Sequence, residues 1–415
     1  MESKMKNWPA DKIERRSVDA LIPYARNART HSDEQVAQIA ASIKEWGWTT
    51  PVLIDEDGEI IAGHGRVMAA RKLGIEEVPT MVATGWTKAQ KQAYVLADNQ
   101  LPQNAGWDMD LLKVEMQDLS GEGFDLSLIG FGDDMLANML VDETEGLTDE
   151  DAVPDVPENP VTVLGDVWLL GNHRLMCGDS TSIDAVEKLM DGRKANMLHT
   201  DPPYGVDYEG VPNDHLKDAQ LEAFLHDALS CAFTALAPGS NTYVWHADIT
   251  ALEFISAFRS AGFKQARPST IQWVKPSLVM SQGDYHLQNE PCLYGWKEGS
   301  GRVRVKDRKQ TTLWKCDRTD EAKVHPTMKP VELCQRAIEN SSDVNGVVLD
   351  LFGGSGSTLI ACEKTNRDCR MMELDPKYCD VIVKRWCEFT GKDATLEANG
   401  KSFSVLEKRL EADAA

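Results

Sequence analysis

The six residues His199-Thr200-Asp201-Pro202-Pro203-Tyr204 decide the fold class of this chain. They follow a short, mainly apolar run at residues 195–198, which is typical of a buried β-strand. Two consecutive prolines cannot continue a strand ladder, so the strand ends there on a stiffened backbone. The motif therefore places an acid, two prolines and a tyrosine at the carboxyl end of a strand, where open α/β sheets bind ligands.

Strands and helices alternate on both sides of this motif. The residue pattern predicts helices at 183–190, 221–236, 252–261 and 358–365, and strands at 241–245, 271–274, 347–352 and 369–373. A hairpin with a turn at Gly171-Asn172 is expected ahead of them. Such alternation predicts a parallel, doubly wound α/β sheet. We expect this domain at residues 161–392, followed by a C-terminal tail at 393–415.

The first hundred residues predict a second, small α+β domain at residues 1–103. A helix is expected between a cap at Ser32 or Asp33 and Gly47, and strands are expected at 51–54, 59–62 and 78–82. The loop Gly63-His64-Gly65-Arg66 lies between the second of these strands and a helix. His64 and Arg66 are candidates for binding a phosphate at that helix start, and a plain turn with a surface arginine is the alternative.

The chain is strongly acidic, and its charge is unevenly distributed. The 66 acids against 44 lysines and arginines give a net charge of −22, which argues against a general nucleic-acid binder. Residues 133–158 contain ten acids and no base, so residues 141–160 are expected to form a solvated acidic linker. A small helical extension is predicted before it, at 104–140, with helices at 107–119 and 126–140, and no helix-turn-helix is evident there. The seven bases within residues 302–318 predict either a DNA-facing segment or a solvated loop.

The sequence carries no sign of a membrane protein or a metal protein. No apolar run approaches the roughly 20 residues that a membrane span needs, and residues 1–16 are too polar for a secretory signal. The nine cysteines are scattered without zinc-site spacing. We therefore expect reduced thiols in a cytoplasmic protein.

A glycine-rich second motif runs from Asp350 to Thr358 and predicts a strand, a tight turn and a helix start. The Gly-Lys-Ser/Thr ending of a phosphate loop is absent, and Asp350 would repel a pyrophosphate but suits an amino group. Glu373 follows Asp350 by 23 residues, the usual spacing for a carboxylate that binds ribose hydroxyls. A ligand with a ribose but no phosphate indicates S-adenosylmethionine; an empty tight turn is the alternative.

Together these motifs resemble the DNA amino-methyltransferases of the β group, which modify the N6 amine of adenine or the N4 amine of cytosine. The match covers residues 161–392 and includes the stretch from His325 to Pro330. The catalytic motif precedes the cofactor motif, which is the permuted order of that group and places Asp179 beside the Glu373 strand. The resemblance implies cofactor contacts from Asp179, Lys329, Pro330, Asp350, Phe352, Gly354, Gly356, Thr358 and Glu373.

The resemblance implies direct methyl transfer to a base that is flipped out of double-stranded DNA. The carboxylate of Asp201 and the carbonyl of Pro202 can accept two hydrogen bonds from the amine and raise its nucleophilicity, while Pro203 stiffens the backbone. Tyr204 can stack on the base. Asp at the first motif position favours adenine, since cytosine enzymes more often carry Ser.

Residues 276–324 lie between the two motif halves and are expected to recognise the target. The alternative for this segment is a lid or a surface insertion. The predicted DNA contacts are Arg302, Arg304, Lys306, Arg308, Lys309 and Lys315.

The N-terminal residues resemble the ParB/sulfiredoxin-like domain. The similarity rests on residues 21–29, 39–43, 60–66 and 97–99. In that family the loop after the second strand binds phosphate or nucleotide, and Arg66 matches a phosphate-binding arginine. Gly65 departs from the Gly-Glu-Arg-Arg loop of the partition proteins, so nucleotide hydrolysis is not implied.

Several functions fit these observations, and the first is favoured. It is an S-adenosylmethionine-dependent N6-adenine DNA methyltransferase with a ParB-like accessory domain. The alternatives are an N4-cytosine enzyme, a ParB-like DNA- or nucleotide-binding protein with an inactive methyltransferase half, and an enzyme acting on glutamine side chains or RNA. The intact catalytic acid and the permuted motif order favour DNA methylation. Homodimerisation and a cognate restriction nuclease are compatible with the resemblance, and the sequence carries no sign of either.

Overall fold

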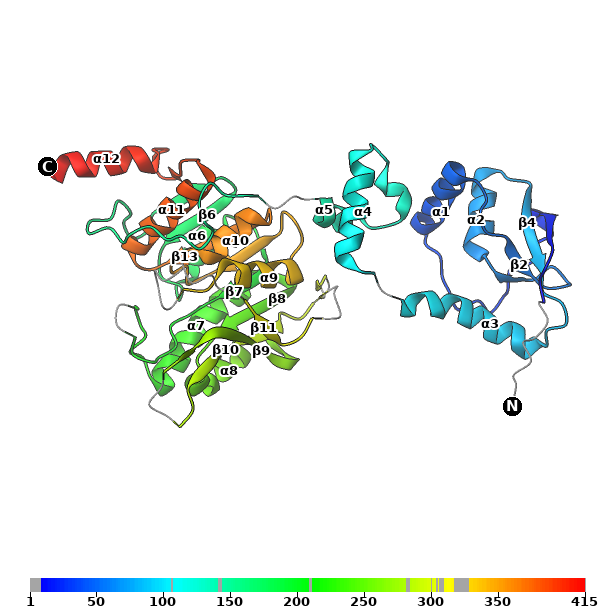
Figure 1. Cartoon of the computed structure of the whole chain (residues 1–415). Coiled ribbons are helices and arrows are strands. Elements are labelled where there is room, and N and C mark those ends of the chain that lie inside the picture. Colours follow the sequence, from blue (N-terminus) through cyan, green and yellow to red (C-terminus); the bar gives the residue numbers. More distant parts are fainter. Residues whose placement is uncertain are drawn as a thin grey trace. The chain divides into compact units, whose positions relative to one another are not determined.

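The computed structural model describes residues 9–105, 107–140, 144–208, 211–280, 284–299, 301–303, 305, 310–316 and 328–414. It divides the chain into two compact units, Met1–Leu140 and Val141–Ala415 (Figure 1). Each unit contains its own β-sheet, with four strands in the first and ten in the second. The two sheets are the α+β and α/β parts that the sequence predicts.

The sheet of the first unit has the strand order β1-β4-β2-β3. Its strands are β1 (Ile13–Ser17), β2 (Val52–Ile54), β3 (Ile60–Ala62) and β4 (Glu77–Val82), with β2 and β4 parallel. Helix α1 (Asp33–Trp46) begins after Ser32, whose hydroxyl accepts the Gln35 N–H at 3.2 Å, and ends at Gly47. Both ends confirm the predicted helix signals. The helix α2 (His64–Leu73) packs Val67 and Ala70 against the sheet.

Helices complete the first unit. They are η1 (Val18–Ala20), α3 (Lys88–Gln100), η2 (Leu101–Asn104), α4 (Met109–Gly121), η3 (Leu126–Ile129) and α5 (Asp133–Leu140). Leu112, Met116 and Leu136 form a small core between α4, η3 and α5. The sequence predicted a single helix at 126–140, but Gly130 adopts a φ of +90° and separates η3 from α5.

The sheet of the second unit has the order β11-β9-β10-β8-β7-β12-β13-β6-β5-β14. Its central strands are parallel, which confirms the predicted α/β class: β6 (His173–Cys177), β7 (Ala195–Thr200), β8 (Leu236–Trp245), β12 (Val347–Asp350) and β13 (Asp368–Glu373). One edge adds the predicted hairpin strand β5 (Val167–Leu170) and β14 (Thr395–Leu396). The other edge adds β9 (Lys264–Val279), β10 (Leu287–Trp296) and β11 (Leu313–Lys315).

Three helices pack on each face of this sheet and make two separate apolar cores. One core includes α6 (Ile183–Met190), α7 (Asp218–Ala235) and α8 (Ala251–Ser260), which follows η4 (Asp248–Thr250). The other includes α9 (Val331–Ser341), α10 (Ser357–Lys364) and α11 (Pro376–Thr390), and Phe403 of α12 (Phe403–Ala414) joins it. Because β6, β7, β12 and β13 are parallel, their carboxyl ends meet at one edge of the sheet, where the predicted site residues lie.

The segment expected to be a target-recognition insertion, residues 276–324, is only partly outside the sheet. Its residues 287–296 form β10, which pairs with both β8 and β9 in the antiparallel direction. The sequence reasoning did not predict this strand, since Pro291 interrupts the apolar pattern and proline is unusual inside a sheet. Cys292 and Leu293 are nevertheless fully buried beside it.

Residues 144–151, expected to belong to a solvated linker, are instead part of the second unit and contact its helices. The backbone N–H of Leu147 donates to the Phe389 carbonyl at 2.7 Å, and the Arg385 guanidinium donates to the Glu150 carbonyl at 2.7 Å. The Asp151 carboxylate accepts the Val331 N–H at 2.9 Å, at the start of α9. An acid at a helix N-terminus is stabilising, which gives part of this charge run a structural role.

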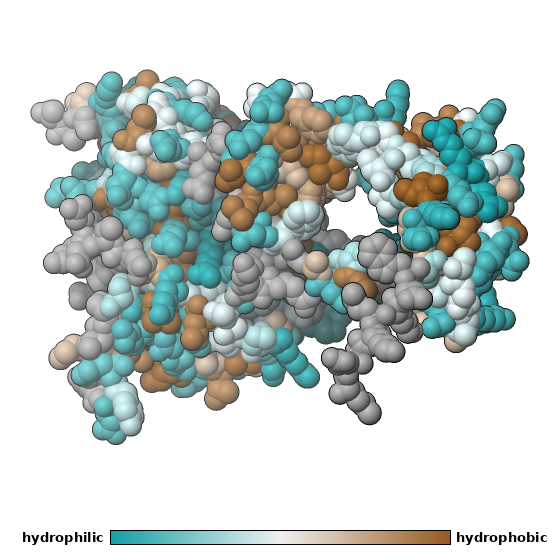
Figure 2. All heavy atoms as spheres, turned by 45° about the vertical axis from the view of Figure 1, so that its right-hand side comes forward, coloured by the Kyte–Doolittle hydropathy of each residue, from teal (hydrophilic) through white to brown (hydrophobic). Residues whose placement is uncertain are grey.

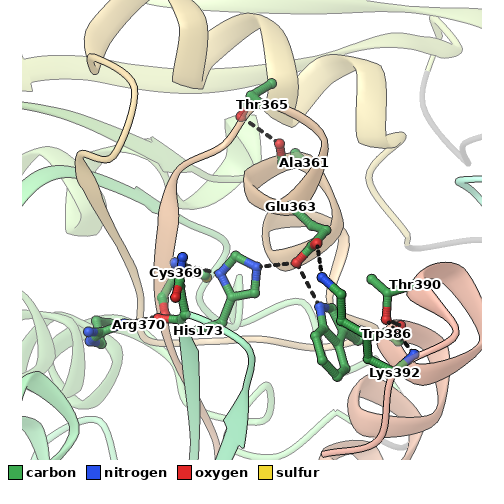
Figure 3. Close-up of polar contacts among 10 residues, drawn as sticks. His173, Ala361, Glu363, Thr365, Cys369, Arg370, Trp386, Thr390 and Lys392 are labelled. Atoms are coloured by element: carbon green, nitrogen blue, oxygen red, sulfur yellow. Dashed lines mark hydrogen bonds and ion pairs between the residues drawn. The ribbon is translucent and has the colours of Figure 1, made fainter. Parts of the chain in front are cut away.

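A polar cluster around Glu363 ties β6, α10 and α11 together (Figure 3). His173 accepts the Cys369 N–H at Nδ1, at 2.9 Å, so Nε2 carries the proton and donates to Glu363 at 2.8 Å. The indole of Trp386 donates to the same carboxylate at 2.9 Å. Burial raises the pKa of Glu363, but the hydrogen bonds from His173 and Trp386 outweigh it and lower the pKa to about 2.

The hydrophilic surface and the free cysteines are those that the amino-acid composition leads us to expect. Hydrophilic residues cover most of the face shown in Figure 2, and hydrophobic residues gather there in smaller patches. Among the described residues, no helix is both long enough and apolar enough to cross a membrane. All nine cysteines are free thiols, and eight of them are buried. The thiols therefore contribute to packing, and none forms a disulfide.

Replacing Glu363 by Ala should destabilise the second unit by about 2–3 kcal/mol at pH 7, because two buried donors lose their charged acceptor. E363Q keeps one acceptor oxygen and should cost less. Since the folded pKa lies below the ordinary 4.5, the contribution of Glu363 is complete above pH 4.5 and is lost as the pH falls toward 2. Urea unfolding at pH 7 and pH 3 measures both effects. An E363A protein with the unfolding midpoint of the unmodified chain at pH 7 would contradict this role.

Candidate active site

A pocket of about 520 Å³ opens at the carboxyl ends of the parallel strands. Both motifs of the sequence contribute to its wall. The predicted residues that line it are Asp179, Asp201, Pro202, Pro203, Tyr204, Lys329, Asp350, Phe352, Gly354, Thr358 and Glu373. Pro330 and Gly356 stand at the starts of α9 and α10, next to residues that line the pocket. The structure thus brings the two motif halves, about 150 residues apart in sequence, into one pocket.

Four charged or phenolic side chains form a cluster at one end of the pocket: Asp201, Tyr204, Glu290 and Lys329. The Lys329 ammonium lies 2.6 Å from Asp201 Oδ2 and 2.6 Å from Glu290 Oε1. The Tyr204 hydroxyl lies 2.5 Å from Asp201 Oδ1 and 2.6 Å from Glu290 Oε1. Lys329 was predicted as a cofactor residue, and in the structure its ammonium pairs with the predicted catalytic acid.

Lys329 balances the two acids of this cluster. Burial lowers the pKa of Lys329, but the charges of Asp201 and Glu290 outweigh it and raise the pKa above its ordinary value. Burial raises the pKa of Glu290, yet Lys329 and Lys275 bring it down to about 2. For Asp201 burial prevails and raises the pKa above its ordinary value, although the charge of Lys329 opposes it. Asp201 keeps 30% of its side chain exposed, against 12% for Glu290, so it is the acid of the cluster that a ligand can reach.

Asp350 lies at the centre of a buried hydrogen-bond network. Its Oδ1 accepts the Thr200 hydroxyl at 2.9 Å and the Phe352 N–H at 3.1 Å, and Thr358 also bonds to the carboxylate. Burial raises the pKa of Asp350 to about 7, against these hydrogen bonds. The carboxyl group therefore sits between its charged and neutral forms near neutral pH.

His199 joins the same hydrogen-bond network through the hydroxyl of Thr358. The Trp245 indole donates to His199 Nε2 at 3.1 Å, so the ring proton sits on Nδ1, 3.1 Å from the Thr358 hydroxyl. Burial and the charge of Lys329 lower the pKa of His199 to about 3. A neutral histidine therefore positions Thr358 toward Asp350 without adding charge.

Glu373 and the glycine-rich turn form the next part of the pocket. The Glu373 carboxylate accepts the Gly354 N–H at 2.8 Å and the Asp375 N–H at 2.9 Å, which fixes its orientation. Gly356 has a φ of +86°, and a Cβ there would meet Ile382 at 3.1 Å. A glycine is therefore required at this position. Burial raises the pKa of Glu373 to about 6.

Asp179 lies where the motif order predicts, beside the Glu373 strand. β6 pairs with β13 so that Cys177 faces Glu373, and the Gly178 N–H donates to the Glu373 carbonyl at 2.9 Å. Asp179 Oδ1 accepts the backbone N–H and the hydroxyl of Thr181, at 2.9 and 2.8 Å. Its carboxylate is exposed and lines the pocket.

Several residues that build the site were not predicted from sequence. Glu290 and Lys275 come from β10 and β9, where no motif marks them. Arg385 donates to the Ser355 carbonyl at 2.8 Å, and the Ser357 hydroxyl donates to the Lys329 carbonyl at 2.7 Å. These bonds fix the glycine-rich turn to the backbone of Lys329, and they join residues too distant in sequence for any spacing rule.

The predicted DNA contacts are only partly described. Arg302 stacks 3.7 Å from the centre of the Trp296 ring and donates to Asn241 and Tyr294, at 3.0 and 3.1 Å, so its guanidinium takes part in packing. Lys315 lies at the end of β11. Arg304, Lys306, Arg308 and Lys309 lie outside the described residues, as does His325.

The two candidates for phosphate binding in the first unit make contacts within the protein. His64 Nε2 accepts the Tyr24 N–H at 3.3 Å, and burial lowers the pKa of His64. The Arg66 guanidinium donates to the carbonyls of Thr50 and Pro51, each at 3.2 Å. Arg66 therefore holds the backbone that leads into β2.

Three family models match the chain. They are the ParB N-terminal domain at residues 2–99, the ParB-methyltransferase HTH domain at residues 110–164, and the DNA methylase family at residues 195–384. The second match corrects the expectation that no helix-turn-helix follows the first domain. It covers most of α4 and all of η3 and α5, of which the sequence predicts η3 and α5 as one helix.

Individual relatives match different parts of the chain. The ParB-like nuclease domain-containing protein YnaK of Escherichia coli is 64% identical over 81 residues, which are 20% of this chain and 93% of the relative. The type II methyltransferase M.HpaI of Haemophilus parainfluenzae is 25% identical over 54% of this chain and 77% of its own length. The DNA adenine methyltransferase YhdJ of Escherichia coli is 22% identical over 48% of this chain and 78% of its own length. Among solved structures, the M1.HpyAVI–SAM complex covers 51% of this chain and 98% of its own, with 21% identity and a TM-score of 0.41.

Replacing Lys329 by Met should destabilise the second unit by about 3–5 kcal/mol at pH 7, because two buried acids lose the cation between them. The exposed pair Lys264–Glu298 provides the control, and K264M should cost less than about 1 kcal/mol. The folded pKa of Glu290 is lowered from 4.5 to about 2, so its stabilisation by Lys329 is complete above pH 4.5 and is lost toward pH 2. The gap between the unmodified chain and K329M in urea unfolding should therefore narrow from pH 7 to pH 3. A gap that widens at pH 3 would contradict the ion-pair account.

Proposed function

Because the chain belongs to the N6/N4 family of DNA methylases and carries a ParB N-terminal domain, we propose that it methylates the N6 amine of adenine in double-stranded DNA. S-adenosylmethionine is the methyl donor of this family. The observation that carries the proposal is the single pocket in which Asp201 and Tyr204 face the acids of the glycine-rich half.

The acids of the pocket fit S-adenosylmethionine chemically. Asp350 offers a carboxylate to the ammonium of the methionine part, and Glu373 can accept hydrogen bonds from ribose hydroxyls. Asp179 can accept a hydrogen bond from the adenine amine of the cofactor. When bound, this cofactor supplies a methyl group on a positively charged sulfur. A pocket in which acids outnumber lysines suits such a cation.

The cluster around Asp201, together with the backbone of Pro202, then acts on the target amine. Asp201 and the Pro202 carbonyl accept the two N–H bonds, which increases the electron density on the nitrogen. The Lys329 ammonium favours the ionised form of Asp201, in which the carboxylate acts as an acceptor. A nitrogen that gains a methyl group must lose a proton, and the partly exposed carboxylate of Asp201 can receive it and pass it to water. Tyr204 offers its ring to the flipped base.

The choice of adenine rests on the acid at the first position of the catalytic motif, because the same family includes N4-cytosine enzymes. The relative named as an adenine methyltransferase, YhdJ, supports this choice without deciding it. The helix-turn-helix match at residues 110–164 and the basic residues between 304 and 315 support DNA as the substrate, whereas Arg302 is engaged in packing. Phosphate or nucleotide binding by the His64–Arg66 loop stays part of the proposal for the first unit.

Replacing Asp201 by Ala should lower methyl transfer at least about 100-fold, because the amine loses its charged acceptor. Binding of S-adenosylmethionine should change little. The experiment incubates the full chain with labelled cofactor and unmethylated DNA of mixed sequence, and the DNA is then digested to nucleosides. The control is D184A, an exposed acid on α6, with unchanged activity.

The nucleoside that carries the label decides the target. N6-methyladenine is expected. Label on cytosine would overturn the adenine assignment, and a chain that binds cofactor but labels no DNA would overturn the proposed function.

The affinity for S-adenosylmethionine should rise with pH through about 7, because burial raises the pKa of Asp350 to about 7 and only the ionised acid attracts the ammonium. Below that pH the affinity should fall by up to about tenfold per pH unit. Calorimetric titration between pH 6 and 7.5 measures this while the ammonium stays charged. D350N should bind more weakly and with a flatter pH dependence. An equally steep dependence in D350N would assign the titration to another group.

A further inference from the structure

We propose that Glu290 is a positioning residue of the methyl-transfer site: it accepts the hydrogen bond of the Tyr204 hydroxyl and thereby frees Asp201 Oδ1 for the target amine. The inference rests on the proposed function, and it concerns a residue that no sequence motif marks.

Both oxygens of Asp201 already have partners in the structure. Oδ2 lies 2.6 Å from the Lys329 ammonium, and Oδ1 lies 2.5 Å from the Tyr204 hydroxyl. An incoming amine needs one of these oxygens as its acceptor. Displacing Lys329 would leave a buried ammonium and two acids unbalanced, which is costly. The hydroxyl of Tyr204 is therefore the partner that competes with the amine for Asp201 Oδ1.

Glu290 offers that hydroxyl another acceptor without any movement of the ring. A phenol has one proton to donate, and the Tyr204 oxygen lies 2.5 Å from Asp201 Oδ1 and 2.6 Å from Glu290 Oε1. Rotation of the hydroxyl about its C–O bond moves the proton from one acid to the other. With the proton toward Glu290, Asp201 Oδ1 is open to the pocket.

Glu290 is well held for this task. Its Oε2 lies 2.6 Å from Lys275, and its Oε1 lies 2.6 Å from Lys329, so the carboxylate cannot turn away. These two lysines lower its pKa to about 2, so it remains an acceptor throughout the physiological range. The strand β10 fixes its backbone between β8 and β9.

A double-mutant cycle tests the inference. We expect E290A to lower kcat about 30- to 100-fold in the presence of Tyr204, because the hydroxyl then donates only to Asp201. In a Y204F background the competing hydroxyl is absent, and the same substitution should cost less than about fivefold. The measurements use the full chain, labelled S-adenosylmethionine and unmethylated DNA of mixed sequence. Calorimetric cofactor binding checks that each variant is folded.

Equal losses from E290A in both backgrounds would overturn the inference, since Glu290 would then act independently of the Tyr204 hydroxyl. A Y204F protein with less activity than E290A would overturn it too, because the hydroxyl would be required and would not be a competitor. Should E290A fail to bind cofactor, E290Q provides the test. Gln keeps an acceptor for the hydroxyl, so kcat should fall less than tenfold.

The pH profile of E290Q adds a readout that a purely structural role would not change. Asp201 is faced by Glu290 and Tyr204, by Lys329, and by Cys292 and Asp350 behind it. Removing the negative charge of Glu290 should move the acid limb of kcat/KM to lower pH. An acid limb of kcat/KM at the same pH in E290Q and in the unmodified chain would contradict an interaction between Glu290 and Asp201. No transfer by the unmodified chain would instead overturn the proposed function, so the two failures are distinguishable.

Discussion

The site depends on one buried cation placed between two acids. Asp201 directly follows β7 and Glu290 belongs to β10, and their carboxylates would repel each other without the Lys329 ammonium at 2.6 Å from both. Lys329 directly precedes Pro330 and helix α9, whose first N–H is capped by Asp151, and its carbonyl accepts the Ser357 hydroxyl from α10. A single lysine therefore joins the catalytic motif, the antiparallel strand β10 and the glycine-rich half, and its burial makes this geometry stiff.

The end of β7 serves both halves of the pocket with three consecutive residues. His199 and Thr200 reach toward Thr358 and Asp350 in the cofactor half, at 3.1 and 2.9 Å, while Asp201 faces the cluster with Lys329. This is possible because β7 and β12 are adjacent and parallel, so their carboxyl ends share one edge. The neutral state of His199 matters here, since a charged imidazole beside Lys329 would add a second buried cation.

The parts of the site that depend on local backbone chemistry could be predicted from the sequence. The two prolines, the glycine-rich turn and the carboxylate on the following strand each have a local physical reason, and the parallel sheet then brings them together. Glu290 was not predictable in this way. It contacts Tyr204 across 86 residues of sequence, and Pro291 obscures the strand that carries it. The contacts of Asp151 and the break at Gly130 were missed for related reasons, because each depends on tertiary packing or on one backbone angle.

The charge of the pocket also resolves the tension between an acidic chain and a DNA substrate. Six acids and two lysines are among the described residues that line it. Such a wall attracts a cationic cofactor and repels phosphate, so the backbone of DNA is held outside while an uncharged base can enter. A base reaches Asp201 only when it is turned away from its own phosphates, which is the geometry of base flipping. The acids of the pocket therefore argue against phosphate binding inside it. The net charge of −22 does not argue against DNA as the substrate, provided that lysines and arginines elsewhere on the chain contact the DNA backbone.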